Sequence, residues 1–128
     1  MKDLKSILAN PDYGLDNILY KKKKALEVLA GYGRNVEALT EYFDRSDIEL
    51  LDGSKKAMKE AEKQNVGKRY CCYLHEFKTD YSKYTLVLGV WALCYLLHGE
   101  MKKFLIDASE ADRLIFVEPI KKANRMSP

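Results

Sequence analysis

Hydrophobic positions in this chain recur mostly at three- and four-residue steps, which is the spacing of one helix face. The longest series contains nine residues, Tyr70, Tyr73, Leu74, Phe77, Tyr81, Tyr84, Leu88, Trp91 and Tyr95. It predicts one long helix from Tyr70 to Leu97, with a break left open near Asp80, which can cap a new helix. Residues 86–97 carry no charge but fall short of the roughly 20 needed to cross a bilayer, so we expect a buried core helix there.

Shorter patterns surround this segment. Apolar positions between residues 15 and 29 predict a helix that ends at Gly31 and Gly33, and Asn35 can cap a short second helix. Ser46 with Glu49 has the spacing of a capping box for a third helix. Further helices are expected around Met101, Phe104 and Leu105, and from Ser109 with Asp112 onward. The prediction is an all-α bundle of five to six helices around one long buried helix, forming a single domain over residues 1–120 with a basic tail at 121–128.

The composition is that of a folded cytosolic domain. Hydrophobic residues make up 47% of the chain and charged residues 32%. The three cysteines, Cys71, Cys72 and Cys94, are an odd number without C-x-x-C spacing, which argues against a disulfide framework and a zinc site. No signal peptide follows Met1. We expect a cytoplasmic protein with no membrane span and no metal.

The net charge of +3 is small, and the basic residues of the chain are interspersed with 19 acidic ones, so nucleic acid is not the expected partner. The run Lys21–Lys24 is expected to be a solvated face. An alternative is a small helical subunit of a nucleoprotein assembly, in which these lysines contact phosphates.

Catalytic and cofactor patterns are sparse. Gly31, Gly33, Gly53 and Gly67 lack the spacing and the expected strand context of a phosphate-binding loop, so no cofactor is predicted. One alternative comes from Arg69 and His75, whose R-x5-H spacing is similar to the catalytic motif of HEPN ribonucleases. That alternative implies a helical dimer that cleaves RNA, although Tyr70 stands where an Asn usually follows the Arg.

Two blocks of the sequence resemble the PoNi-type immunity proteins, helical antidotes to PoNe DNase toxins of competing bacteria. The first block covers residues 25–43 and is similar to that family's helix, glycine-containing turn and short Leu-rich helix. The second covers residues 80–120 and is similar to its apolar helix, short Phe/Leu helix and acidic turn. Members of the family are usually longer and more acidic.

The resemblance implies a non-enzymatic protein that binds and neutralises a cognate nuclease toxin. Carboxylates that cover the basic cleft of the nuclease would then form the binding surface. The candidates are Asp44, Asp47, Glu49, Asp52, Asp107, Glu110 and Asp112. Each can instead be a helix-start carboxylate that interacts with the helix dipole. The oligomeric state stays open.

Overall fold

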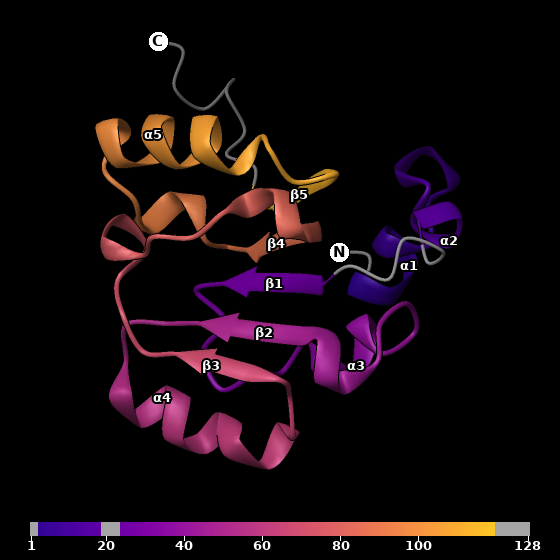
Figure 1. Ribbon diagram of the computed structural model, residues 1–128, viewed down its shortest axis with the longest axis horizontal. Helices are drawn as coiled ribbons and strands as arrows, with labels where there is room; N and C mark the ends of the chain where they lie inside the picture. The colour runs from indigo at the N-terminus through magenta and orange to yellow at the C-terminus, as the bar shows by residue number, and fades with distance from the viewer. Residues whose placement is uncertain (1–2, 19–23, 120–128) are drawn as a thin grey trace, which may run out of the picture.

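A five-stranded parallel sheet forms the centre of the protein. The computed structural model describes residues 3–18 and 24–119. The strands are β1 (Lys24–Val28), β2 (Ile48–Leu51), β3 (Lys68–Tyr70), β4 (Tyr84–Val90) and β5 (Arg113–Val117). All neighbouring strands pair in parallel, in the order β3-β2-β1-β4-β5 (Figure 1). The order therefore reverses direction between β1 and β4.

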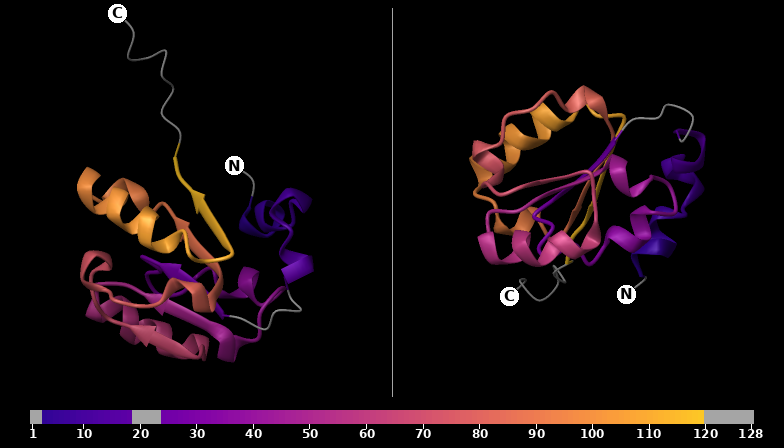
Figure 2. Two further views of the ribbon diagram at one scale, coloured as in Figure 1. Left: turned by 45° about the horizontal axis from the view of Figure 1, so that its top comes forward. Right: turned by 60° about the horizontal axis from the view of Figure 1, so that its bottom comes forward.

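Helices cover both faces of the sheet (Figure 2). The α-helices are α1 (Leu4–Leu8), α2 (Leu15–Ile18), α3 (Val36–Leu39), α4 (Lys55–Glu60) and α5 (His98–Ala108). On one face Leu8, Leu39 and Met58 pack against Leu50 and the other inward residues of the strands. On the opposite face Phe104 of α5 packs with Tyr81, Tyr84 and Leu26. The connection from β3 to β4 also lies on the α5 face, as the short 3-10 turns η5 (Leu74–Glu76) and η6 (Tyr81–Lys83).

The prediction of an all-α bundle is wrong. The stretch expected as one helix from Tyr70 to Leu97 contains the end of β3, two 3-10 turns, all of β4 and the turn η7 (Leu93–Tyr95). Strand β4 is buried on both faces, because helices pack on each side of the sheet. Such a strand is apolar at almost every position and loses the alternation that identifies a strand in sequence.

Some of the predicted helices are present in the structure, although the predicted fold class is wrong. A short helix does follow Asn35, and α5 includes Met101, Phe104 and Leu105 as expected. Ser46 and Glu49 do not open a helix, since β2 begins at Ile48, and the next helix is capped by Ser54, whose hydroxyl accepts the Ala57 N–H at 3.2 Å.

Two further predictions concern the chain as a whole. Within the described ranges, no helix is both long and apolar enough to span a membrane. The predicted tail at 121–128 and Lys21–Lys23 lie outside the described residues. The cytoplasmic location and the division at residue 120 stay predictions.

Candidate functional site

The loops that follow the strands meet at one edge of the sheet, because parallel strands all end on the same side. In Figure 1 this is the edge toward which the arrowheads of β1 and β2 point. The reversal of strand order between β1 and β4 lies here, and in open α/β sheets ligands bind outside the carboxyl ends of the strands at such a point.

A hydrogen bond joins the loop after β1 to the end of β2. The Gly31 N–H donates to Asp52 Oδ2 at 2.8 Å, and the Ser54 N–H donates to Asp52 Oδ1 at 2.8 Å. Gly31 and Gly33 have φ angles of 59° and 86°, a region that favours glycine. A Cβ on Gly33 would come within 2.9 Å of Gln64 Cγ, whereas a Cβ on Gly31 would meet no atom within 4 Å. The first glycine therefore faces open space and the second allows close packing.

A cavity of about 290 Å³ lies beside this loop, lined by Glu27, Leu29, Gly31, Tyr32, Arg34, Asn35, Asp52, Trp91, Tyr95 and their neighbours. Glu27, at 1% exposure, contributes a buried carboxylate. Asn35 Nδ2 donates to Glu27 Oε2 at 2.7 Å, and Glu27 Oε1 has no hydrogen-bond partner among the described residues. Burial raises the pKa of Glu27 to about 7, although Asn35 and Arg34 favour its ionised form.

Two non-glycine residues that line this cavity have left-handed backbone. Leu29, just after β1, has φ of 51°, and Trp91, just after β4, has φ of 55°. The Trp91 N–H donates to the Val117 carbonyl at 2.7 Å, and the Glu118 carboxylate accepts the Ala92 and Cys94 N–H groups. Backbone in such sparsely populated regions concentrates at functional sites.

A second, more apolar cavity of about 460 Å³ continues from the first. Leu29, Asp52 and Tyr95 line both cavities. The remaining wall comes from the ends of β2 and β3 and from the segment that leads into α5: Leu51, Gly53, Ser54, Cys72, Tyr73, Leu74, His75, Leu96 and Glu100. Asp52 therefore lies at the junction of a polar cavity and an apolar one.

The structure does not place Arg69 and His75 on one helix. Arg69 is on the edge strand β3, where its guanidinium donates to the Met58 carbonyl and lies 3.7 Å from Glu62 Oε1. His75 is in η5, with Nδ1 3.3 Å from Glu100 Oε2. The geometry expected for the HEPN-type alternative is absent from this part of the chain.

The seven carboxylates proposed from the sequence do not form one surface. Asp52 is in the site described above, and Glu49 is buried in β2. Asp107 is on α5, where it pairs with Lys103, and the others are on different connections: Asp44, Asp47, Glu110 and Asp112. A binding role for these carboxylates stays a prediction.

By sequence, the chain matches no protein-family model and no curated protein. By structure, it is similar to a SAM-dependent methyltransferase of Leishmania major, with a TM-score of 0.66 at 21% identity, over 89% of this chain and 54% of that one. It is also similar to CalS10, an amino pentose methyltransferase from Micromonospora echinaspora described with SAM bound, with a TM-score of 0.70 at 16% identity. That match covers 95% of this chain and 53% of CalS10.

The chain has the fold of the SAM-dependent methyltransferases. A third such structure is phosphoethanolamine N-methyltransferase 1 of Haemonchus contortus, in complex with phosphoethanolamine and S-adenosylhomocysteine. Its TM-score is 0.66 at 18% identity, and the match covers 94% of this chain and 29% of that one. This chain thus spans between 29% and 54% of the length of these three methyltransferases.

These similarities correct the functional prediction. The resemblance to PoNi-type immunity proteins rested on helix patterns, but residues 25–43 begin with β1 and residues 80–120 contain β4 and β5. The structures that share the fold are enzymes, described with SAM or S-adenosylhomocysteine rather than with a toxin. The predictions of a non-enzymatic immunity protein, of a toxin partner and of a HEPN-type ribonuclease are therefore wrong.

The sequence did contain a signal for the site that was missed. Leu26, Glu27 and Val28 precede a glycine pair, and Asp52 follows Gly31 by 21 residues. A strand, a glycine-containing turn and an acidic residue about 20 positions later are typical of nucleoside binding at the first strand of a parallel sheet. The helix predicted between residues 15 and 29 leaves no strand before these glycines, whereas the structure has β1 there. Among the described residues, no group of three or more His, Cys, Asp or Glu side chains could hold a metal ion.

Proposed function

We propose that this chain is a SAM-binding methyltransferase domain whose cofactor site is the pair of cavities at the carboxyl ends of β1, β2 and β4. The observation that carries the proposal is the hydrogen bond from the Gly31 N–H to Asp52 Oδ2 at the reversal of strand order. It holds the open glycine turn at the polar cavity next to the Asp52 carboxylate, which lines both cavities.

The residues present fit this cofactor in charge and shape. Arg34 offers a guanidinium that suits a carboxylate, and Glu27 offers a buried carboxylate oxygen without a partner among the described residues. Together, the guanidinium and the carboxylate are complementary to the carboxylate and the ammonium of an amino-acid group. The open space beside Gly31 leaves room for a ligand close to the backbone.

Each side chain has a separate role in the proposed site. Asp52 would accept the ribose hydroxyls, since each of its oxygens uses one hydrogen bond within the protein and retains a further lone pair. The apolar second cavity would hold the adenine ring. When bound, the cofactor supplies an electrophilic methyl group on a sulfonium. The exposed rings of Tyr32, Trp91 and Tyr95 line the polar cavity and would shape the approach of a methyl acceptor.

A dinucleotide cofactor fits less well. The helix after the glycine turn, α3, has four residues, too few to build the long dipole that binds a pyrophosphate. In the G-x-G-x-x-G pattern the third glycine allows close packing of this helix, and here Val36 occupies that position. NAD⁺ is therefore a suitable negative control.

Calorimetric titration with S-adenosylhomocysteine tests the proposal. We expect saturable binding to the whole chain and none with NAD⁺. Asp52→Asn, which keeps the side-chain shape, should weaken binding about tenfold to a hundredfold, because a hydrogen bond to a charged group contributes about 1.5–3 kcal/mol. Asp44→Asn is the matched control, since Asp44 is exposed and lines neither cavity. Absence of binding to the wild type, or equal binding to the wild type and Asp52→Asn, overturns the proposal.

A further inference from the structure

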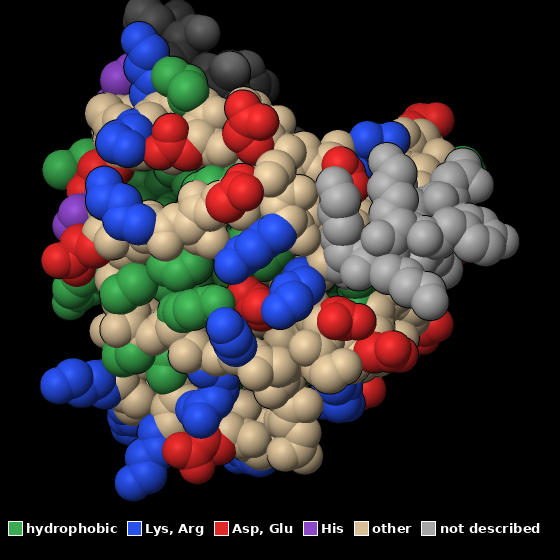
Figure 3. All heavy atoms as spheres, viewed as in Figure 1, with side chains coloured by type: hydrophobic (Ala, Val, Ile, Leu, Met, Phe, Trp, Pro, Cys, Tyr) green, Lys and Arg blue, Asp and Glu red, His purple; other side chains and the backbone are tan. Residues whose placement is uncertain are grey.

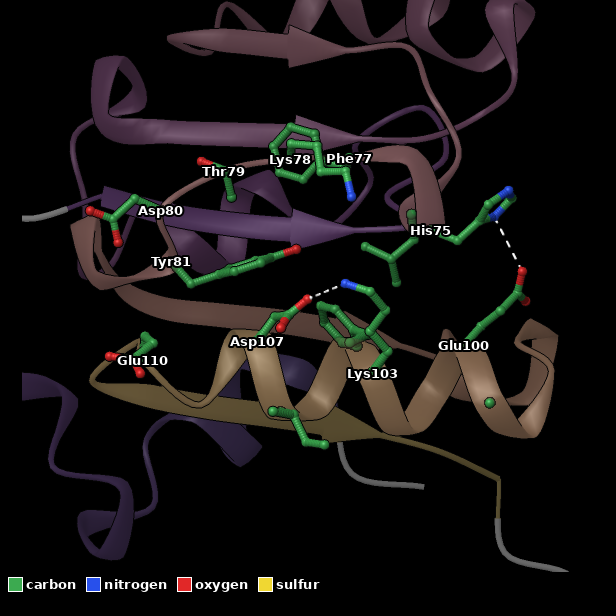
Figure 4. A pocket seen from close by; sticks show the side chains of 14 residues that line it. His75, Phe77, Lys78, Thr79, Asp80, Tyr81, Glu100, Lys103, Asp107 and Glu110 are labelled. Atoms are coloured by element: carbon green, nitrogen blue, oxygen red, sulfur yellow. Dashed lines mark hydrogen bonds and ion pairs between the residues drawn. The ribbon is translucent and has the colours of Figure 1, made fainter.

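A further cavity of about 640 Å³ lies on the α5 face and adjoins the apolar cavity of the strand-end site. Its walls are α5 on one side and residues 74–81 on the other (Figure 4). In the space-filling view a hollow beside α5 shows hydrophobic side chains at its base (Figure 3). The aromatic part of its lining is Phe77, Tyr81 and Phe104, with ring centroids 6.4 Å apart for Phe77 and Tyr81 and 6.0 Å apart for Tyr81 and Phe104. This volume is in the range of small-molecule sites.

Tyr81 supplies a polar atom that the protein leaves unpaired. The residue is only 5% exposed, and Figure 4 shows its hydroxyl pointing into the cavity. No described residue makes a hydrogen bond with this hydroxyl. The Tyr81 ring is buried, whereas its hydroxyl opens onto the cavity, which is the side from which a ligand donor can reach it.

The charges around the cavity favour a cation. Four carboxylates line it, from Asp80, Glu100, Asp107 and Glu110, against two ammonium groups from Lys78 and Lys103. Lys103 Nζ lies 2.9 Å from Asp107 Oδ2, which leaves Asp107 Oδ1 free of any hydrogen bond to a described residue. Burial raises the pKa of the Tyr81 hydroxyl, and the nearby charge of Asp107 adds to that shift. The exposed carboxylate of Asp107 and the Tyr81 hydroxyl therefore lie near each other beside an aromatic base (Figure 4).

We propose that this cavity is a second ligand site, for a small molecule with an apolar ring and one ammonium group. The ring would lie against Phe77 and Phe104. The Tyr81 hydroxyl oxygen and the Asp107 carboxylate would accept the N–H donors of the ammonium group. The site does not depend on the proposed cofactor site, although Leu74, His75 and Glu100 line both this cavity and the apolar one beside Asp52.

Two probes of matched ring and opposite charge test the proposal, 2-phenylethylamine and phenylacetate. Each is titrated into the ¹⁵N-labelled whole chain and followed by NMR. We expect the amine to give saturable shifts of the Phe104, Ile106 and Asp107 amides and of the His75 ring, which lies in the cavity wall. The ring of His98, which does not line the cavity, is the internal reference. Phenylacetate should give no saturable shift.

Substitutions locate the binding groups. Tyr81→Phe keeps the ring and should weaken amine binding about fivefold, and Asp107→Asn should weaken it about tenfold, as expected for the loss of a neutral and a charged hydrogen bond. Tyr42→Phe and Asp44→Asn are the matched controls outside the cavity, and should bind as the wild type does. Spectra of the free variants report that each is folded.

Three outcomes overturn the proposal. In the first, the amine gives no saturable shift in the lining residues. In the second, both probes bind equally, which removes the selection for a cation. In the third, Tyr81→Phe and Asp107→Asn bind the amine like the wild type. None of these outcomes bears on S-adenosylhomocysteine binding, which is measured at the other site.

Discussion

Two buried glutamates on neighbouring strands differ in their pKa because they differ in their partners. Glu49 and Glu27 are each 1% exposed. Glu49 accepts hydrogen bonds from the Tyr84 hydroxyl at 2.6 Å, the Tyr70 hydroxyl at 3.1 Å and Lys24 Nζ at 3.2 Å. Burial by itself raises the pKa of Glu49, but these donors outweigh it and the pKa lies below its ordinary value of 4.5. Glu27, with Asn35 as its one described hydrogen-bond donor, has its pKa raised to about 7.

The Glu49 network should stabilise the protein at neutral pH and lose that effect in acid. A carboxyl whose pKa is lower when folded contributes stability above the unfolded pKa, and the contribution disappears as the pH falls through the folded value. We expect Glu49→Gln to lower the free energy of unfolding by about 1–3 kcal/mol at neutral pH. Urea unfolding should show the difference shrinking below pH 4.5. Glu110→Gln, at an exposed position, is the control and should show no such pH dependence; a constant difference at all pH values would contradict this account.

Glu27 should have the opposite effect on the pH dependence of stability. Its folded pKa is above the unfolded value of 4.5, so the folded state binds the proton more tightly and stability falls as pH rises from 4.5 to about 7. In Glu27→Gln this decline should be absent, and the free energy of unfolding should stay level over the same interval. The measurement is urea unfolding at several pH values, with the exposed Glu37→Gln as control. A wild type whose stability is level across this interval contradicts the prediction.

At the scale of the elements, strand β4 and strand β5 approach closely at Gly89. A Cβ on Gly89 would lie 2.6 Å from Phe116 Cδ1 and 3.0 Å from Ala92 Cβ. The Phe116 ring in turn packs edge-on against Phe104 of α5, with centroids 5.7 Å apart. The glycine therefore makes room for the ring that joins the sheet to its helix.

Gly89→Ala should lower the free energy of unfolding by about 1–3 kcal/mol, the usual cost of overpacking a core. Phe116→Leu in the same chain should remove part of that added cost, because it takes away the ring that the new methyl group meets. Gly99→Ala is the matched control: a Cβ there meets no atom within 4 Å, so a helical alanine should be neutral or stabilising by up to about 1 kcal/mol. Additive effects of Gly89→Ala and Phe116→Leu in thermal unfolding would contradict a direct clash.

At the scale of the whole molecule, the two central strands hold the structure together. β1 and β4 pair with each other, lie between two helical layers and are buried almost throughout. β3, by contrast, has three residues, lies at the end of the sheet and exposes Lys68 and Arg69. Charged side chains on an edge strand also oppose pairing with another sheet.

Amide hydrogen exchange should follow this order. We expect the slowest exchange in β1 and β4, whose amides open only with global unfolding, and the fastest strand exchange in β3. Mass spectrometry of the whole chain after timed exchange checks it, and α5 provides a helical comparison. Equal protection of the segments 24–28 and 68–70 would contradict a core centred on β1 and β4.

What the sequence determined by itself was local. Asp80 accepts the Ser82 N–H at the start of a turn, as its side chain predicts from neighbouring residues alone. Met58 and Ala61 lie three residues apart, a spacing that predicts one buried face, and both are buried in an otherwise charged segment. These features depend on contacts within a few residues, which a sequence pattern records directly.

The tertiary structure decided the fold class and the site. Strand β4 is apolar at almost every position because both of its faces are covered, so hydrophobic periodicity within residues 84–90 does not distinguish that run from a buried helix. The β-branched residues Thr85, Val87 and Val90 favour a strand there, but only as a local preference. The pairing that makes it a strand comes from β1, about 60 residues earlier. Likewise Gly31 and Asp52 form one site only because parallel pairing of β1 with β2 brings both strand ends to the same edge of the sheet.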